Sequence, residues 1–250
     1  VSTYLGIARS KGQKEGLARI FQGVIFQLAR QLQVFLQKAH KDPEAETWRP
    51  SVVCISEDSF KRFAAFELLG WLSYKFGFGT YIHRIEGYLS KDSSEVAQKA
   101  LVRLIKMAEA SKTNIYLDTL ISPSYTSAIA QVIQLPGISG KENNMILFEF
   151  SKNNPYNLPD IVDNFQLSKS TSFDVCVLGS SDKSFGFRKE IHVWLTQKDF
   201  DNANLMILLS YIILGHSDWQ EGNIKIFALY PREDLEQEKR KIMDLIDSGR

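Results

Sequence analysis

Apolar positions over residues 17–39 recur at the spacing of one helical face, which predicts a long amphipathic helix. The stripe comprises Leu17, Ile20, Phe21, Val24, Ile25, Leu28, Leu32, Phe35, Leu36 and Ala39. The helix should end near His40, because Asp42-Pro43 follows. Residues 1–16 are polar and contain glycines, which is typical of a connector. An exposed linker rarely keeps so large an apolar stripe, so we expect it to pack against the α/β part that follows.

After the connector, short apolar runs alternate with helical patterns. The predicted elements are strands at 51–56, 80–89, 114–120 and 144–150 and helices at 60–76, 93–110 and 124–135. Ser93 or Ser94 is the expected cap of the second of these helices. Buried strands that alternate with helices predict an α/β fold, with an open, mostly parallel sheet covered by helices on both faces.

The turn signal Asn153-Asn154-Pro155 is the best internal boundary. Beyond it, helices are predicted at 158–167, 202–214 and 233–246, and strands at 173–178, 190–195 and 223–229. The strand segments 52–56 and 174–178 echo each other. We therefore interpret the chain as a connector with a helix (1–44) and two similar α/β halves (45–152 and 153–250).

The composition argues against several classes of function. The 250 residues include 30 Lys plus Arg against 29 Asp plus Glu, which argues against a nucleic-acid binder with a broad basic face. Two cysteines, Cys54 and Cys176, lie in apolar runs and read as buried small hydrophobic residues. The longest apolar stretch, residues 203–214, falls short of the ~20 residues of a membrane span and reads as a buried helix. No signal peptide is expected.

Catalytic and metal-binding patterns are missing from the sequence. The four histidines have no partner at metal-ligand spacing, and His83 and His192 fall in predicted strands, where structural roles are more common. No Gly-x-Ser-x-Gly elbow or phosphate-binding Gly-x-x-x-x-Gly-Lys-Ser/Thr loop occurs. We therefore predict no catalytic residues, no metal and no enzyme activity.

Three loops contain residues that suit a binding site. Residues 179–186 hold glycines, hydroxyls and a lysine that suit an anion, but a strand follows, so an inter-strand loop is favoured. Residues 137–140 read as a helix stop. Glu57 and Asp58 follow a strand and precede a helix, so capping of that helix is favoured over acid–base chemistry.

An ordered series of short segments resembles the C-terminal cytosolic domain of cation-chloride cotransporters. Trp48-Arg49-Pro50 directly precedes the first strand, as an Arg-Pro pair does in that family. The series continues with 114–116, 135–140, 143–148, 191–195, the helix 204–214, Trp219 and 224–227. The short connection between the strands at 173 and 190, and Leu195 in place of a second tryptophan, resemble a short prokaryotic member.

The resemblance implies a function that belongs to a larger protein. In that family, within the amino acid-polyamine-organocation superfamily, a membrane part moves chloride with sodium or potassium. Its cytosolic domain has two halves akin to universal stress proteins and contributes to dimerisation and regulation. We therefore expect the partners to be the chain's own transmembrane domain and a second copy, at the cytoplasmic face of the membrane. A weak homodimer is expected through the aromatic residues of the second half, Trp194, Phe200, Tyr211, Trp219 and Tyr230.

Some relatives hold adenine nucleotide, but the glycine motif of nucleotide-binding stress proteins is absent here. Asn153-Asn154 and Tyr230-Pro231 follow strands without a glycine in either turn. We therefore assign no cofactor-binding residues and expect no cofactor. Two alternatives stay open: a free-standing stress-protein-like nucleotide binder, and the cytosolic tail of an amino-acid permease.

Overall fold

A computed structural model describes residues 22–35, 48–135, 137–138, 142–183, 185–229 and 235–248. The chain divides into two compact units. One contains the helix over residues 22–35, and the other begins at Arg49 and contains the sheets. Each unit is described by itself.

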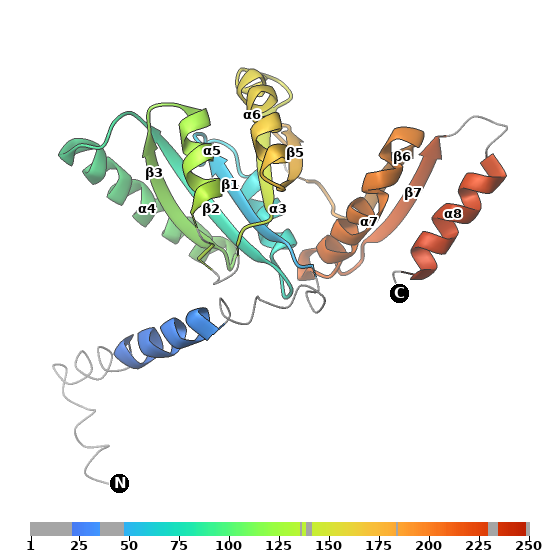
Figure 1. The fold of residues 1–250 in the computed structure, drawn as a ribbon, viewed down its shortest axis with the longest axis horizontal. Coiled ribbons are helices and arrows are strands. Elements are labelled where there is room, and N and C mark those ends of the chain that lie inside the picture. Colours follow the sequence, from blue (N-terminus) through green and yellow to red (C-terminus); the bar gives the residue numbers. More distant parts are fainter. Residues whose placement is uncertain are drawn as a thin grey trace, which may run out of the picture. The chain divides into compact units, whose positions relative to one another are not determined.

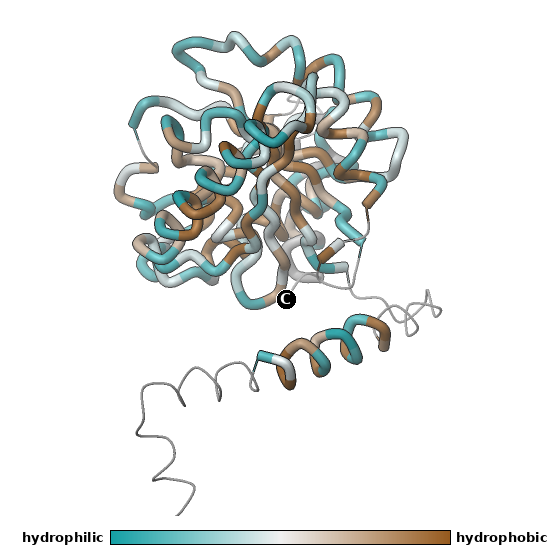
Figure 2. Tube along the Cα trace, turned by 90° about the vertical axis from the view of Figure 1, so that its left-hand side faces the viewer, coloured by the Kyte–Doolittle hydropathy of each residue, from teal (hydrophilic) through white to brown (hydrophobic). Residues whose placement is uncertain are grey.

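The helix over residues 22–35 confirms the central part of the helix predicted at 17–39, while both predicted ends lie outside the described residues. Several of its large apolar side chains are exposed, including Val24, Leu28 and Phe35, and Figure 2 shows apolar residues along its length. The packing expected for this stripe stays a prediction.

The larger unit is built on a five-stranded parallel sheet. Its strands are β1 Ser51–Ser56, β2 Phe78–Glu86, β3 Tyr116–Ser122, β4 Met145–Ser151 and β5 Asp174–Ser180. Their order in the sheet is β3-β2-β1-β4-β5, and every neighbouring pair is parallel. In register, Cys54 of β1 lies between Tyr81 of β2 and Leu147 of β4.

Helices cover both faces of this sheet (Figure 1). They are α3 Ala64–Leu72, α4 Lys91–Ser111, α5 Tyr125–Gln134 and α6 Leu158–Ser170. Alternate residues of each strand point to opposite faces, so Val52 packs in the cluster with α3 and α4, whereas Val53 packs in the cluster with α5 and α6. The predicted α/β class, with an open parallel sheet between two layers of helices, is confirmed.

A second, smaller sheet follows in the same unit. Its parts are β6 Glu190–Thr196, α7 Phe200–Leu214 and β7 Asn223–Leu229, with two short 3-10 turns (Gln197–Asp199 and Ser217–Trp219), and α8 Leu235–Ser248 comes last. β6 and β7 form a two-stranded parallel sheet. Among the described residues, no helix combines the length and apolar character needed to cross a bilayer.

Helix α7 explains the apolar stretch noted at 203–214. Ala203 and Ile207 pack on the β6–β7 sheet, while Leu205 and Leu209 pack on the core around α3. A helix that contacts apolar partners on two sides needs apolar residues around most of its circumference. The predicted buried helix is therefore confirmed, although Tyr211 remains 45% exposed.

The expected boundary at residue 153 is corrected by the pairing of β5. Strand β5 pairs with β4 from Met145↔Asp174 to Ser151↔Ser180, so a division there would cut a continuous sheet. The change of sheet occurs between β5 and β6, and two similar halves are not confirmed, because the sheets have five and two strands. The echoing segments 52–56 and 174–178 are two strands of the same sheet. A turn signal marks where a strand ends but not which strand pairs next.

Two helix boundaries also differ from the prediction. Helix α3 begins at Ala64 instead of 60, because the backbone N–H groups of Lys61 and Arg62 bond to the carbonyl of Asp58 in a preceding turn. Helix α4 begins at Lys91, and its cap is Ser90 rather than Ser93 or Ser94. Ser90 and Ser93 bond each other's backbone N–H reciprocally.

Candidate functional site

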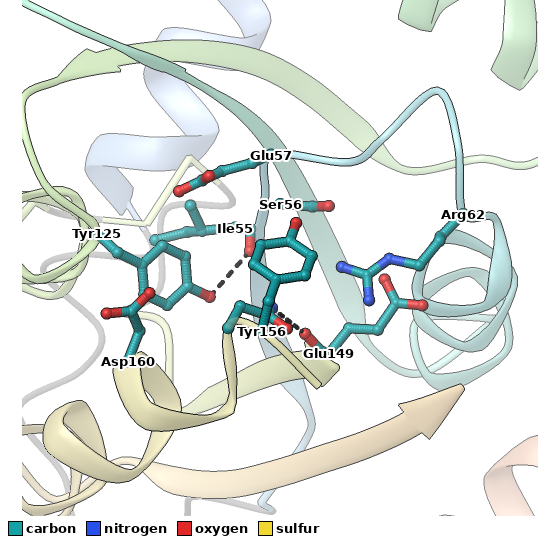
Figure 3. Close-up of a pocket in the computed structure, with 9 residues that line it drawn as sticks. Ile55, Ser56, Glu57, Arg62, Tyr125, Glu149, Tyr156 and Asp160 are labelled. Atoms are coloured by element: carbon teal, nitrogen blue, oxygen red, sulfur yellow. Dashed lines mark hydrogen bonds between the residues drawn. The ribbon is translucent and has the colours of Figure 1, made fainter. Parts of the chain in front are cut away.

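The strand order reverses direction between β1 and β4, and this is where doubly wound sheets bind ligands, beside the carboxyl ends of the strands. A crevice lies at this point (Figure 3). We call it the switch-point crevice, and it is lined by Ile55, Ser56, Glu57, Arg62, Tyr125, Glu149, Tyr156, Asn157 and Asp160. These residues come from the ends of β1 and β4, the turn before α3, the loop between β4 and α6, and the first turns of α5 and α6.

The crevice is closed around a very small space of about 10 Å³, roughly enough for one water molecule. Tyr125 closes one side, with its hydroxyl donating to the carbonyl oxygen of Ile55 at 3.1 Å. Asn157 closes another, with its Nδ2 donating to the carbonyl oxygen of Glu149 at 2.8 Å. Tyr156, on the loop between β4 and α6, donates its hydroxyl to the carboxylate of Asp58.

Glu57 and Asp58 do not cap α3, which corrects the sequence prediction. The residue at the N-cap of α3 is Phe63, and it makes no side-chain cap bond. Glu57 instead accepts a hydrogen bond from Nε of Arg84 on β2 at 2.6 Å and forms an ion pair with Nη2 of the same guanidinium at 2.5 Å. A turn closed by the carbonyl of Asp58 separates both acids from α3, and the backbone N–H of Ala65 acts on Glu149 of β4 instead.

Asp58 is held as a carboxylate. Burial alone would raise its pKa, but the hydrogen bonds from Tyr156 and Lys61 and the charge of Arg62 outweigh burial and lower the pKa. Lys61 Nζ lies 3.1 Å and Arg62 Nη2 3.3 Å from the carboxylate. For Tyr156, burial and the bond to Asp58 raise the pKa to about 12.

Glu149 is the opposite case. It is 4% exposed, and neither of its carboxylate oxygens has a hydrogen-bond partner within the described part of the chain. Burial raises its pKa, and the Ser180 hydroxyl, the charge of Arg62 and the backbone N–H of Ala65, which all lower it, offset only part of that effect. Arg62 Nε and Nη1 and Asn157 Oδ1 are likewise buried and without a partner among the described residues. Since buried polar groups are normally bonded, these atoms mark an unusual spot.

The residues of this crevice escaped the sequence prediction, with the exception of Glu57 and Asp58. Arg62, Tyr156 and Asn157 come from turns with no recognisable motif. Glu149 did give a signal, because it is the only charged residue of the otherwise apolar strand Met145–Ser151. A charge at a buried position of a parallel strand is uncommon unless it is paired.

The histidines occupy separate places. As predicted, His83 and His192 lie in strands β2 and β6. His83 Nδ1 lies 2.9 Å from Ser59 Oγ, and burial lowers its pKa. His216 accepts a hydrogen bond from the backbone N–H of Asp218, and His40 lies outside the described residues. No cluster of three potential metal ligands occurs in the part of the chain that the structure describes.

The cysteines lie where the sequence placed them. Cys54 is fully buried in β1, and Cys176 is partly buried in β5, with β4 between the two strands. Burial raises the pKa of the Cys176 thiol to about 11 and raises that of Cys54 well above its usual value. Both are therefore protonated packing groups rather than nucleophiles.

The connection between β5 and β6 leads directly into a strand, as predicted. Its residue Arg188 bridges Glu67 of α3 at 2.6 Å and Asp218 at 2.7 Å, with its guanidinium 5.0 Å from the ring of Trp71. A cleft of about 400 Å³ lies beside this bridge, between the ends of α3 and α4 and residues 216–218. Sequence patterns gave no sign of either feature.

No known protein-family model matches the chain.

Proposed function

We propose that this chain is the cytosolic regulatory and dimerisation domain of a secondary transporter that cotransports chloride with sodium, potassium or both. The observation that carries the proposal is the ordered series of segments that resemble that family. Members of the series lie on successive elements: 48–50 before β1, 114–116 leading into β3, 143–148 leading into β4, 191–195 in β6 and 224–227 in β7. The proposed partners are the chain's own transmembrane domain and a second copy, at the cytoplasmic face.

A non-catalytic role agrees with the chemistry of the crevice. Asp58 and Glu57 are engaged by cationic partners. Ser59 Oγ and His83 Nδ1 form a hydrogen-bonded pair, and neither residue lines the crevice. The thiols are protonated.

The nucleotide-binding alternative finds less support. Four acidic residues stand at or beside the crevice, Glu57, Asp58, Glu149 and Asp160, against three cations, Lys61, Arg62 and Arg84, that already engage Asp58 or Glu57. A polyphosphate would meet electrostatic repulsion there. The turn between β4 and α6, at Asn153-Asn154-Pro155, also lacks the glycines that let phosphate approach the backbone.

Dimerisation is supported by one face of the β6–β7 sheet. Helix α7 covers the opposite face. Here Trp194 is 53% exposed and stacks on Phe227 at 4.5 Å between ring centroids. Parallel sheets normally have both faces covered, so an exposed tryptophan stacked on the half-buried Phe227 favours a partner. Of the other expected interface aromatics, Tyr211 is exposed, Trp219 is a core residue, and the side chain of Phe200 and all of Tyr230 lie outside the description.

Two measurements test the proposal. The full-length protein that contains this chain should take up chloride in liposomes only when sodium or potassium is supplied, and no cation-dependent uptake would reject the transporter assignment. Sedimentation of the isolated chain across a concentration series should reveal a dimer with a micromolar or weaker dissociation constant. Trp194→Ala should weaken it, whereas the buried control Trp219→Phe should not. A monomer at every concentration would contradict dimerisation by this domain.

A further inference from the structure

The walls of the switch-point crevice carry opposite charges that do not meet. Among the described residues, the two carboxylate oxygens of Glu149, from β4, lack a well-formed hydrogen bond, although the Ser180 hydroxyl and the N–H of Ala65 are near enough to act on them. Nε and Nη1 of Arg62, from the turn before α3, likewise have no partner there. The remaining guanidinium nitrogen, Nη2, forms an ion pair with the Asp58 carboxylate at 3.3 Å. No ion pair joins Glu149 to Arg62 within the described residues, and Figure 3 shows both side chains directed into the same space. The fold therefore buries an acceptor and a donor without joining them.

The other charges of the crevice are mostly neutralised. Arg84 engages Glu57, and Lys61 together with Arg62 engages Asp58. Asp160, in the first turn of α6, adds a further carboxylate at the rim. A purely anionic guest would face Glu149 and Asp160, and a metal ion or simple amine would face the guanidinium of Arg62. A small molecule with both charges meets a partner at each end.

We propose that the switch-point crevice binds a small zwitterion of the amino-acid kind. Its ammonium group lies toward Glu149, beside the ring of Tyr156, since aromatic faces and carboxylates both attract organic ammonium groups. Its carboxylate lies toward the free N–H groups of Arg62. The site does not depend on the transporter assignment, because it rests only on this crevice.

Tyr156 is the gate of this site. The closed crevice has about 10 Å³ of free space, so an amino acid enters only after a side chain moves. Tyr156 is 54% exposed, comes from the loop between β4 and α6, and its one side-chain hydrogen bond among the described residues goes to Asp58. Breaking that bond frees the ring to turn outward, whereas Tyr125 is anchored to the backbone of β1.

The test is thermal unfolding and titration calorimetry of the whole chain with the common amino acids, starting with glycine. Methylamine and acetate, which each carry one of glycine's two charges, are the probes for single-charge binding. We expect at least one amino acid to raise the melting temperature, with methylamine and acetate giving no shift at the same concentration. Equal shifts from methylamine or acetate would overturn the zwitterion assignment, as would the absence of any shift in both the wild type and Tyr156→Phe.

Variants locate the site. Glu149→Gln and Arg62→Gln should each reduce the affinity for the amino acid at least tenfold. Tyr156→Phe should bind it more tightly, because the closed state loses the hydrogen bond from Tyr156 to Asp58. The control Glu221→Gln changes an exposed residue that pairs only loosely with Lys189, at 3.9 Å, and should bind as the wild type does. Undiminished binding by Glu149→Gln would place the ligand elsewhere. Weaker binding by Tyr156→Phe would exclude the gate.

Discussion

At the scale of single residues, Glu149 combines a buried position with an unpaired carboxylate. Its neighbours on β4 are apolar and lie in the core, so nothing in the strand pattern compensates the charge. A buried polar group without a partner costs roughly 1–3 kcal/mol, more when charged. Functional positions often carry such a cost in folding stability, and replacing the charged side chain by a neutral one reduces the cost.

Glu149→Gln should therefore stabilise the empty protein at neutral pH by on the order of 1 kcal/mol. Burial raises the pKa of Glu149, so the folded state binds its proton more tightly than the unfolded state does. Stability in the wild type should fall as pH rises from near 4.5, the usual value, through the raised pKa. The variant should lack that decline. Urea unfolding at several pH values checks this, and a constant difference across the pH range would contradict it.

Gly77 occupies a position that has no room for a Cβ atom. A Cβ at this position would lie 2.6 Å from the carbonyl oxygen of Pro50 and 2.8 Å from that of Leu72. The Pro50 carbonyl already accepts the N–H of Phe78 at 2.8 Å, so the backbone cannot withdraw without loosening the start of β2.

Gly77→Ala should thus destabilise the fold by roughly 1–3 kcal/mol, the usual cost of overpacking. Gly23 is the matched control, since it lies inside the helix over residues 22–35 with no neighbour within 4 Å of an added Cβ. Gly23→Ala should leave the sheet unit unchanged and favour its own helix by up to about 1 kcal/mol. The comparison is made by denaturant midpoints; equal effects would show that the contact at Gly77 is not what matters.

At the scale of elements, α3 and α7 join the two sheets through a tryptophan. Trp71 is 2% exposed, with its ring 5.3 Å from that of Trp219 and 4.7 Å from that of Phe185. Its Nε1 donates to Asp218 at 3.1 Å, and the carboxylate of Asp218 also pairs with Arg188. The joint is therefore apolar inside and closed by charges outside.

Trp71→Ala should cost about 3–5 kcal/mol, as expected for a large aromatic side chain removed from a core. Trp194→Ala is the matched control, because Trp194 is 53% exposed and its loss should change stability by less than about 1 kcal/mol. Both variants are compared by guanidinium unfolding at a protein concentration low enough to avoid association. Similar losses from the two would argue that Trp71 does not anchor the joint.

At the scale of the whole molecule, we expect the five-stranded sheet and the helices that cover it to unfold as one cooperative unit. Strand β5 completes that sheet beyond the turn at 153–155, and α6 covers the face that contains Phe148 and Ile146. The β6–α7–β7 segment adds to this unit through the joint at Trp71 instead of forming an equal second half.

A fragment of residues 48–182 should accordingly unfold cooperatively, whereas a fragment of residues 48–152 should not. The shorter fragment lacks β5 and α6, which exposes one edge of β4 and the apolar side chains beneath α6. The longer fragment retains both, at the cost of exposing the face of α3 that α7 covers. Circular dichroism during heating and amide exchange distinguish the two fragments. Cooperative unfolding of the shorter one would restore the boundary at 153.

The sequence by itself determined the α/β class, the identity of every described strand of the two sheets, and the burial of Cys54, while Cys176 is only partly buried. It succeeded because periodicity and β-branched runs report locally which face of an element is apolar. Only the tertiary structure decided that β5 joins the first sheet, that α7 lies between two apolar partners, and that Glu149 faces Arg62 across the switch point. Those features depend on which strands become neighbours. Strand order is set by the direction of each crossover and the packing of whole layers, which no local pattern records.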